Sequence, residues 1–279
     1  MIKYSNDPTI CKLYARLADL AALSERGEVA ATPFLTPREA IYAKSYLDVR
    51  MREGSAYLYG GYLCAERVRA ILLPSYIEGM LSPKDDVSPA VALSDVGFSE
   101  LSQEVSDLVA LLSVRGSGFR NLTHRDYLGS VLGLGLERDV LGDILVEDEH
   151  HAYLFCKGEI ADFVTEHLTH VGHDPVCVQK LPPDTPLQIK KNTLPIHDTV
   201  ASPRLDCVVA ALCNLSRERA QAVIRSGVVE VSYEVCDACD ETVLPPCVLS
   251  VRGVGKFRVL SFDGETRKGR IRLVAEKYI

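Results

Sequence analysis

Five prolines cluster between residues 182 and 203, and they constrain how the 279-residue chain can fold. They are Pro182, Pro183, Pro186, Pro195 and Pro203. Proline lacks the N–H that helix interiors and inner strands require, and polar residues surround these five, so the segment is typical of a connection between domains. The sequence therefore predicts a linker over residues 182–201 and a separate domain over residues 202–279.

Charge is distributed unequally on the two sides of this linker. From Val200 onward, 12 Lys and Arg stand against 10 Asp and Glu, which leaves 19 against 28 for residues 1–199. The net charge of −7 thus arises in the front of the chain and argues against a nucleic-acid coat over the whole protein. The last 28 residues hold eight basic and three acidic residues, and this local excess suits contacts with phosphate.

The first part of the chain, residues 1–66, is predicted to be a helical region. Leu13, Leu17 and Leu20 recur at helical spacing. Thr36, with Pro directly after it and Glu39 at the third helical position, has the pattern of a capping box. A second helix is therefore expected from about residue 37 to residue 52.

The middle of the chain, residues 67–181, alternates between strand and helix patterns. Strands are predicted over residues 67–73, 108–114, 143–146, 152–156 and 176–180, and helices over 123–134 and 159–170. From residue 108 onward the order is strand, helix, strand, strand, helix, strand, which is that of the ferredoxin-like sandwich shared with RRM domains. We therefore predict an α+β protein with a helical N-terminal part, an RRM-like middle domain and a small α+β C-terminal domain.

Composition indicates a soluble, cytoplasmic protein. No apolar run reaches the roughly 18 residues of a membrane span, and the first residues lack the pattern of a secretory signal. The nine cysteines are accordingly expected to be reduced thiols. Cys236 and Cys239 have the spacing of half a zinc site and Cys247 follows nearby, but no second such pair exists. We expect a loop with exposed thiols there, and we predict no metal and no cofactor.

Four short motifs follow one another in the C-terminal domain. They are Ser202–Asp206, Ser216–Ala220, Ile224–Val231 and Ser250–Phe257. Helices are expected over residues 204–213 and 217–225, and strands over 228–231, 248–251 and 256–260. In this order the motifs resemble the S-four RNA-binding domain. The resemblance covers nearly the whole C-terminal domain. It implies that Arg204, Arg217 and the glycine turn, residues 252–256, form a basic face that binds structured RNA.

The chemistry of these residues agrees with that resemblance. Arg204 before the first helix, and Ser216 and Arg217 at the start of the second, can converge on one edge where helix N-terminal N–H groups and guanidinium groups favour phosphate oxygens. Gln221, four residues after Arg217, is uncharged, so Arg225 and Lys256 would have to supply the flanking charge. The glycines of the turn allow close approach to a ligand, or simply mark a tight hairpin. The predicted RNA-binding residues are Arg204, Ser216, Arg217, Arg225, Arg252, Gly253, Gly255 and Lys256.

A longer resemblance covers nearly the entire chain. Its further motifs are Phe34–Glu39, Leu122–Gly129, Gly135–Ile144 and Glu159–Val164. Together with the C-terminal domain they resemble the YlmH-like family of bacterial proteins. This resemblance implies a non-enzymatic binder of structured RNA, either rRNA of the large ribosomal subunit or tRNA, that acts in ribosome-associated quality control and, in some bacteria, in cell division.

Two alternatives stand beside this interpretation. S-four domains also occur in pseudouridine synthases and rRNA methyltransferases, but residues 70–181 show no nucleophile paired with a base, and the single Arg-Leu-Asp tripeptide lies inside the small C-terminal domain. We therefore predict no catalytic residues. The other alternative is a protein adaptor whose acidic front contacts a division or signalling partner, and it is compatible with RNA binding.

Overall fold

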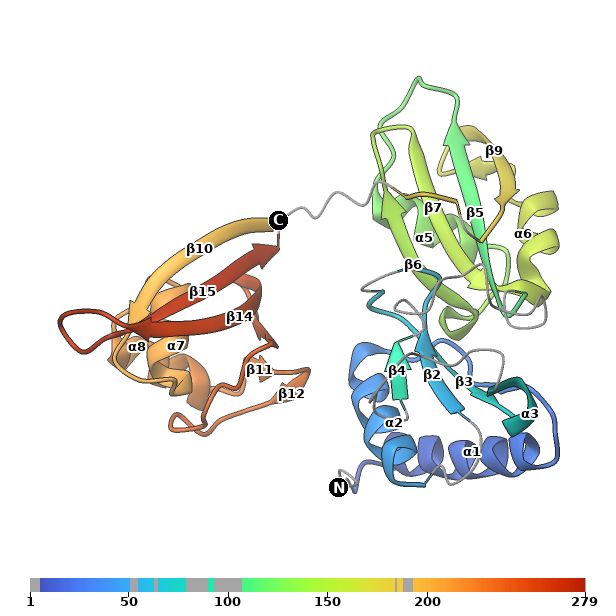
Figure 1. Ribbon diagram of the computed structural model, residues 1–279. Helices are drawn as coiled ribbons and strands as arrows, with labels where there is room; N and C mark the ends of the chain where they lie inside the picture. The colour runs from blue at the N-terminus through green and yellow to red at the C-terminus, as the bar shows by residue number, and fades with distance from the viewer. Residues whose placement is uncertain are drawn as a thin grey trace. The chain divides into compact units, whose positions relative to one another are not determined.

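The computed structural model describes residues 6–50, 55–62, 65–78, 90–92, 107–183, 185–187 and 193–278. The chain divides into two compact units, Met1–Ile189 and Lys190–Ile279, and both contain helices and sheets (Figure 1). The predicted α+β class is therefore confirmed. Among the described residues, no helix has the length and apolar character needed to cross a membrane.

The N-terminal part of the first unit packs helices on a small sheet. The helices are α1 (Pro8–Glu25), α2 (Pro37–Arg50) and α3 (Ser75–Glu78). The strands are β1 (Ala30–Ala31), β2 (Ser55–Tyr59), β3 (Arg69–Leu73) and β4 (Ala90–Ala92), in the order β1-β3-β2-β4. The prediction of a purely helical region missed this sheet, because its strands are short and pair with partners distant in sequence.

Local capping determines where two helices of this unit begin. The backbone N–H of Thr36 donates to Glu39 Oε2 at 2.8 Å, and the Thr36 hydroxyl oxygen accepts from the Glu39 N–H at 3.3 Å. Thr123 and Asp126 start α5 (His124–Leu132) in the same way, with the Thr123 N–H 2.8 Å from Asp126 Oδ2. Both capping boxes satisfy N–H groups that a helix leaves free, and the one at Thr36 is as predicted.

The middle part of the first unit is a ferredoxin-like sandwich. Its elements are β5 (Val109–Gly116), α5, the 3-10 turn η3 (Arg138–Val140), β6 (Leu141–Val146), β7 (His151–Lys157), the 3-10 turn η4 (Gly158–Ile160), α6 (Ala161–His167), β8 (His170–Val171) and β9 (Asp174–Leu181). The sheet order is β6-β7-β5-β9-β8, so the first strand, β5, lies between β7 and β9 in the middle of the sheet. One core cluster joins Leu112 and Leu154 of the sheet to Tyr127 of α5 and Val164 of α6.

The opposite face of this sheet is covered by the N-terminal part. Leu111 and Phe155 lie in one core cluster with Tyr57 and Ile71. Buried Arg69 donates from Nε to the Thr32 carbonyl at 2.6 Å, and burial lowers its pKa to about 10. The two parts therefore form one folded unit. The predicted boundary between residues 66 and 67 lies inside this unit, because β3 belongs to the N-terminal sheet.

The second unit is a six-stranded antiparallel sheet with two helices. The strands are β10 (Thr193–Val200), β11 (Val229–Val231), β12 (Glu234–Val235), β13 (Cys247–Val251), β14 (Gly255–Glu265) and β15 (Ile271–Tyr278), in the order β10-β15-β14-β13-β11-β12. The helices are α7 (Leu205–Leu212) and α8 (Arg217–Arg225), both close to their predicted bounds. Gly227, with φ +70°, follows the C-cap Ser226 of α8 in the left-handed conformation that favours glycine after a helix.

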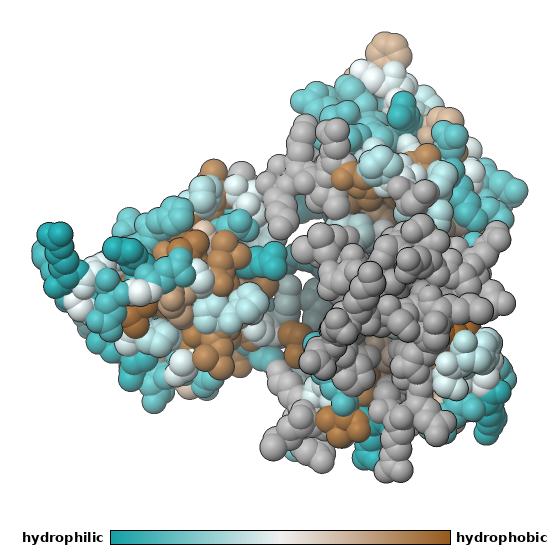
Figure 2. Space-filling model, in the orientation of Figure 1, coloured by the Kyte–Doolittle hydropathy of each residue, from teal (hydrophilic) through white to brown (hydrophobic). Residues whose placement is uncertain are grey.

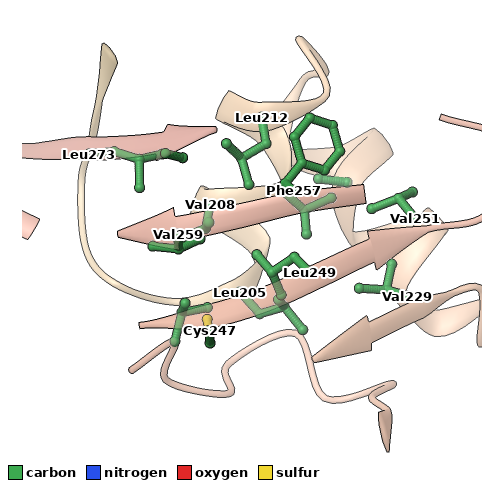
Figure 3. Packing of buried hydrophobic residues seen from close by; sticks show 14 of the residues in the cluster. Leu205, Val208, Leu212, Val229, Cys247, Leu249, Val251, Phe257, Val259 and Leu273 are labelled. Atoms are coloured by element: carbon green, nitrogen blue, oxygen red, sulfur yellow. The ribbon is translucent and has the colours of Figure 1, made fainter. Parts of the chain in front are cut away.

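The core of the second unit lies between the helices and one face of the sheet. Leu205, Val208 and Leu212 of α7 project toward Leu249 and Phe257 of the central strands (Figure 3). These side chains recur every three or four residues along α7, so one stripe of the helix is apolar. This packing holds α7 in place against the sheet. It therefore also fixes the position of the residues that precede and follow the helix.

The predicted linker is only partly a linker. Residues 193–200 form β10 and pair with β15 along its whole length, so the prediction of a linker over residues 182–201 is wrong for its second half. Pro195 lies inside this strand opposite Glu276. The strand tolerates a proline because β10 is the edge of the sheet and only one side of its backbone requires partners.

Candidate nucleic-acid interface

A buried carboxylate organises the start of both helices of the second unit. Asp206, in the first turn of α7, is fully buried. Its Oδ1 accepts from Arg204 Nε at 3.2 Å, and its Oδ2 accepts from Arg217 Nε at 3.1 Å and from Gln221 Nε2 at 2.9 Å. Burial alone would raise the pKa of Asp206, but the hydrogen bonds from these three side chains outweigh it and hold the pKa well below its usual range.

This carboxylate brings two predicted binding residues together. The side chains of Arg204 and Arg217 remain 40% and 56% exposed while each holds Asp206 by one edge of its guanidinium group. Their remaining N–H groups are free to reach a ligand, and little side-chain entropy remains to be lost on binding. Asp206 and Gln221 are the positioning residues that the sequence analysis missed. A carboxylate inside an otherwise apolar helix, two residues after an arginine, was the available signal.

The two helix N-termini differ in what they can offer a phosphate. Ser216 caps α8, and its Oγ accepts from the Arg219 N–H at 3.3 Å. At α7, the N–H groups of Leu205 and Asp206 already donate to the carbonyls of Glu241 and Cys239, at 2.8 and 3.1 Å. The expectation that both N-termini face phosphate is therefore wrong for α7, because a loop of the same unit occupies its first turn.

That loop contains the Cys-x-x-Cys pair. Cys236 and Cys239 are half-buried and pack against the core of the unit, and Cys239 Sγ lies 3.7 Å from the Gln221 carbonyl oxygen. The expectation of exposed thiols is wrong, because the loop closes over the start of α7. Cys247 is buried in β13, and burial raises its pKa to about 11. Within the described ranges, no three His, Cys, Asp or Glu side chains gather to hold a metal ion.

The glycine turn forms a second group of predicted residues. Gly253 and Gly255 have φ values of +83° and +145°, which favour glycine. Gly227, Arg252 and Lys256 are among the residues that line a hollow of about 410 Å³ beside this turn.

In this group, contacts with aromatic rings position the Lys256 side chain, whereas Arg225 is exposed to solvent. Lys256 Nζ lies 4.9 Å from the ring centre of Tyr278 and 5.4 Å from that of Tyr233, a cation–π arrangement. Arg225 is exposed in the last turn of α8, two residues before Gly227.

The predicted residues therefore do not form one continuous edge. Ser216 and Arg217 lie at the start of α8, and Asp206 joins Arg204 to Arg217, whereas Arg225 and the glycine turn lie at the end of α8. At 1.5 Å per residue, the nine residues of α8 separate the two groups by roughly 12 Å. Each group can contact phosphate, but a single phosphate cannot reach both.

The first unit contains a contact that resembles a hydrolase triad. Ser113 Oγ lies 2.8 Å from His151 Nε2, and His151 Nδ1 lies 2.5 Å from Glu147 Oε2. Both Ser113 and His151 are buried, at 4% and 7% exposed. Ser113 lies in β5, which pairs with β7 on one side and β9 on the other, so its backbone N–H belongs to the sheet and cannot stabilise an oxyanion. The contact is structural.

These features define a class of protein, a two-unit α+β chain with an RRM-like sandwich and a C-terminal module that presents arginines. Residues 108–185 match the family model described as "Putative RNA-binding domain in YlmH". The chain is 32% identical over 256 residues to the "Ribosome-associated protein quality control protein P2" of Bacillus subtilis (strain 168), covering 91% of this chain and 90% of that protein. It also matches the solved structure of the "Cell division protein ylmH from Streptococcus pneumoniae" at 23% identity with a TM-score of 0.45, covering 64% of this chain and 94% of that chain. The chain belongs to the YlmH-like family, as its motifs predicted.

Proposed function

We propose that this protein binds structured RNA on the ribosome without catalysing a reaction, and that Arg204 and Arg217 are its principal phosphate contacts. The observation that carries the proposal is the pair of half-exposed guanidinium groups held on buried Asp206. A matched RNA-binding family domain supports RNA as the ligand, and the name of the Bacillus relative supports a ribosome-associated role in quality control.

Charge favours the second unit for the phosphate contacts. Residues 108–185 contain 6 Lys and Arg against 12 Asp and Glu, and this excess of negative charge disfavours contact with a phosphate backbone. Residues 200–279 contain 12 basic and 10 acidic residues. The middle domain would then contribute shape, and the C-terminal unit would contribute the salt-dependent part of the affinity.

Structured RNA fits better than a single strand. RRM domains bind single strands by stacking bases on aromatic residues of the open sheet face. Here Phe155 of that face is buried and stacks on Tyr62, with ring centres 4.9 Å apart. Because the N-terminal part covers this half of the sheet, the protein depends on backbone and groove contacts, which suit rRNA helices of the large subunit or the folded surface of tRNA.

A protein-adaptor function is a second candidate. The acidic excess of residues 108–185 would attract a basic protein surface, such as that of a ribosomal protein or a division partner. An adaptor of this kind would keep its partner when Arg217 is replaced, and the experiment below separates the two candidates on this point.

The test is co-sedimentation of the full-length protein with separated ribosomal subunits over a salt series. The matched variants are Arg217→Glu and Arg219→Glu, which make the same charge change on the same exposed helix, two residues apart and hence on opposite sides of it. We expect the wild type to pellet with the large subunit, with log affinity falling against log salt at a slope of roughly −3 to −4 for four contacts. Arg217→Glu should stay in the supernatant and Arg219→Glu should still pellet. Equal behaviour of the two variants, or no binding by the wild type, would refute RNA binding through Arg217.

A further inference from the structure

The hairpin of β14 and β15 extends past the two helices of the second unit (Figure 1). Its turn contains Arg267, Lys268 and Arg270, and Figure 2 shows this end of the hairpin in the deep teal of hydrophilic residues. The turn is ordered by its own hydrogen bonds. The Thr266 N–H donates to the Arg270 carbonyl at 2.7 Å, and the Gly269 N–H donates to the Thr266 carbonyl at 2.9 Å.

Arg270 is held against the neighbouring edge strand. Its Nε donates to Thr199 Oγ1 at 2.9 Å, and its Nη2 donates to the Thr199 carbonyl. One edge of the guanidinium group is thereby fixed on β10, and its Nη1 remains for another acceptor. This arrangement repeats that of Arg217, whose Nε is held by Asp206 while the rest of the group is exposed.

Arg217 and Arg270 line the same hollow. Its volume is about 320 Å³, and Arg217, Asn214, Thr199 and Arg270 are among the residues around it. The acidic residue of its lining is Asp198, which accepts from the Thr199 N–H at 2.6 Å. With two arginines against one carboxylate, the hollow remains positive.

We propose that this hollow binds one phosphate group of the RNA backbone, with Arg217 and Arg270 as its two donors, and that Arg267 and Lys268 contact phosphates farther along the same strand. The inference rests on the proposed function and deepens it, because it gives the direction of the bound strand. The strand runs from the start of α8 along the β14–β15 hairpin, away from the glycine turn at the other end of α8. Two arginines that line one hollow, each with one edge of its guanidinium group already held, can bind a phosphate at a defined place.

The test measures salt slopes for full-length variants on isolated large ribosomal subunits. Arg270→Gln removes the second donor, and the double variant Arg267→Gln/Lys268→Gln removes the contacts at the turn, where both side chains are exposed. Lys12→Gln is the matched control, because it removes one exposed positive charge from α1 in the other unit. Thermal unfolding of each variant checks that it is folded.

We expect Arg270→Gln to weaken binding roughly tenfold and to reduce the salt slope by about one, and the double variant to reduce it by about two. Arg270→Lys should keep the slope and still bind more weakly, because it keeps the charge and loses the planar group. If Arg217→Gln weakens binding while Arg270→Gln and the double variant match Lys12→Gln, the hollow is not the phosphate site and the proposed function stands. If Arg217→Gln also matches the control, both proposals fail.

Discussion

Replacing Asp206 by asparagine should destabilise the second unit without changing the first. The amide keeps the shape of the side chain, but its NH₂ group would face donors from Arg204, Arg217 and Gln221 in place of the oxygen that accepts from them now. Hydrogen bonds to a charged group contribute about 1.5–3 kcal/mol each. Three are lost, but Arg204 and Arg217 are 40% and 56% exposed and regain water, so the net cost is about 2 kcal/mol.

For a unit of this size, such a loss should lower Tm by about 10 °C. Differential scanning calorimetry of the full-length protein follows both units in one experiment. The control is Asp237→Asn, an exposed carboxylate of the same unit. A shift of less than about 2 °C, or an equal shift for the control, would show that the carboxylate does not stabilise this unit.

The Asp206→Asn variant should also change how the stability of the second unit depends on pH. The pKa of Asp206 is lower in the folded state than in the unfolded chain, so its stabilisation is complete above the unfolded value near 3.9 and is lost as the pH falls toward the folded value. The difference in Tm between wild type and Asp206→Asn should therefore be constant near neutral pH and shrink progressively below about pH 5. A difference that is independent of pH would contradict the assigned hydrogen bonds.

Three further predictions concern packing and thiol reactivity. Gly158→Ala would place a Cβ 1.7 Å from the Asp107 carbonyl oxygen, so the backbone must shift, and urea titration should show a loss of about 1–3 kcal/mol or more in the first unit. Phe257→Ala empties the centre of the second core and should cost about 3–5 kcal/mol, seen as a lower calorimetric transition of that unit alone. Cys247, whose pKa is raised to about 11, should resist iodoacetamide at pH 8 in the folded protein while exposed Cys177 reacts, as mass spectrometry of the labelled peptides would show.

The sequence predicted the elements whose signals are local. The capping box at Thr36, the helices α7 and α8, and the order of strands and helices along the sandwich segment all depend on residues within one or two turns or on simple alternation. β10 was missed because a strand containing Pro195 is indistinguishable from a linker until its partner is known. That partner lies more than seventy residues away, and only its edge position makes the proline acceptable.

The candidate site was predictable in its arginines and unpredictable in its arrangement. Arg204 and Arg217 follow from motif positions, but their shared partner Asp206 depends on the packing angle of two helices. Arg270 could not be associated with Arg217 from the sequence, since the two line one hollow only after the sheet has brought β10 and the β14–β15 turn together. The length of α8 separates the glycine turn from Arg217, because the two lie at opposite ends of this helix. The sequence did not predict this separation.

The pairing of β10 with β15 also affects how the protein is made. These two strands are the first and last of the second unit, and their paired residues are separated by 71 to 85 positions. During synthesis β10 emerges from the ribosome long before β15, so its edge stays unpaired until the strand ending at Tyr278 is released. The first unit can complete its sheets earlier. The second unit should therefore fold late and as a whole, and a chain cut short before β15 would be open to degradation.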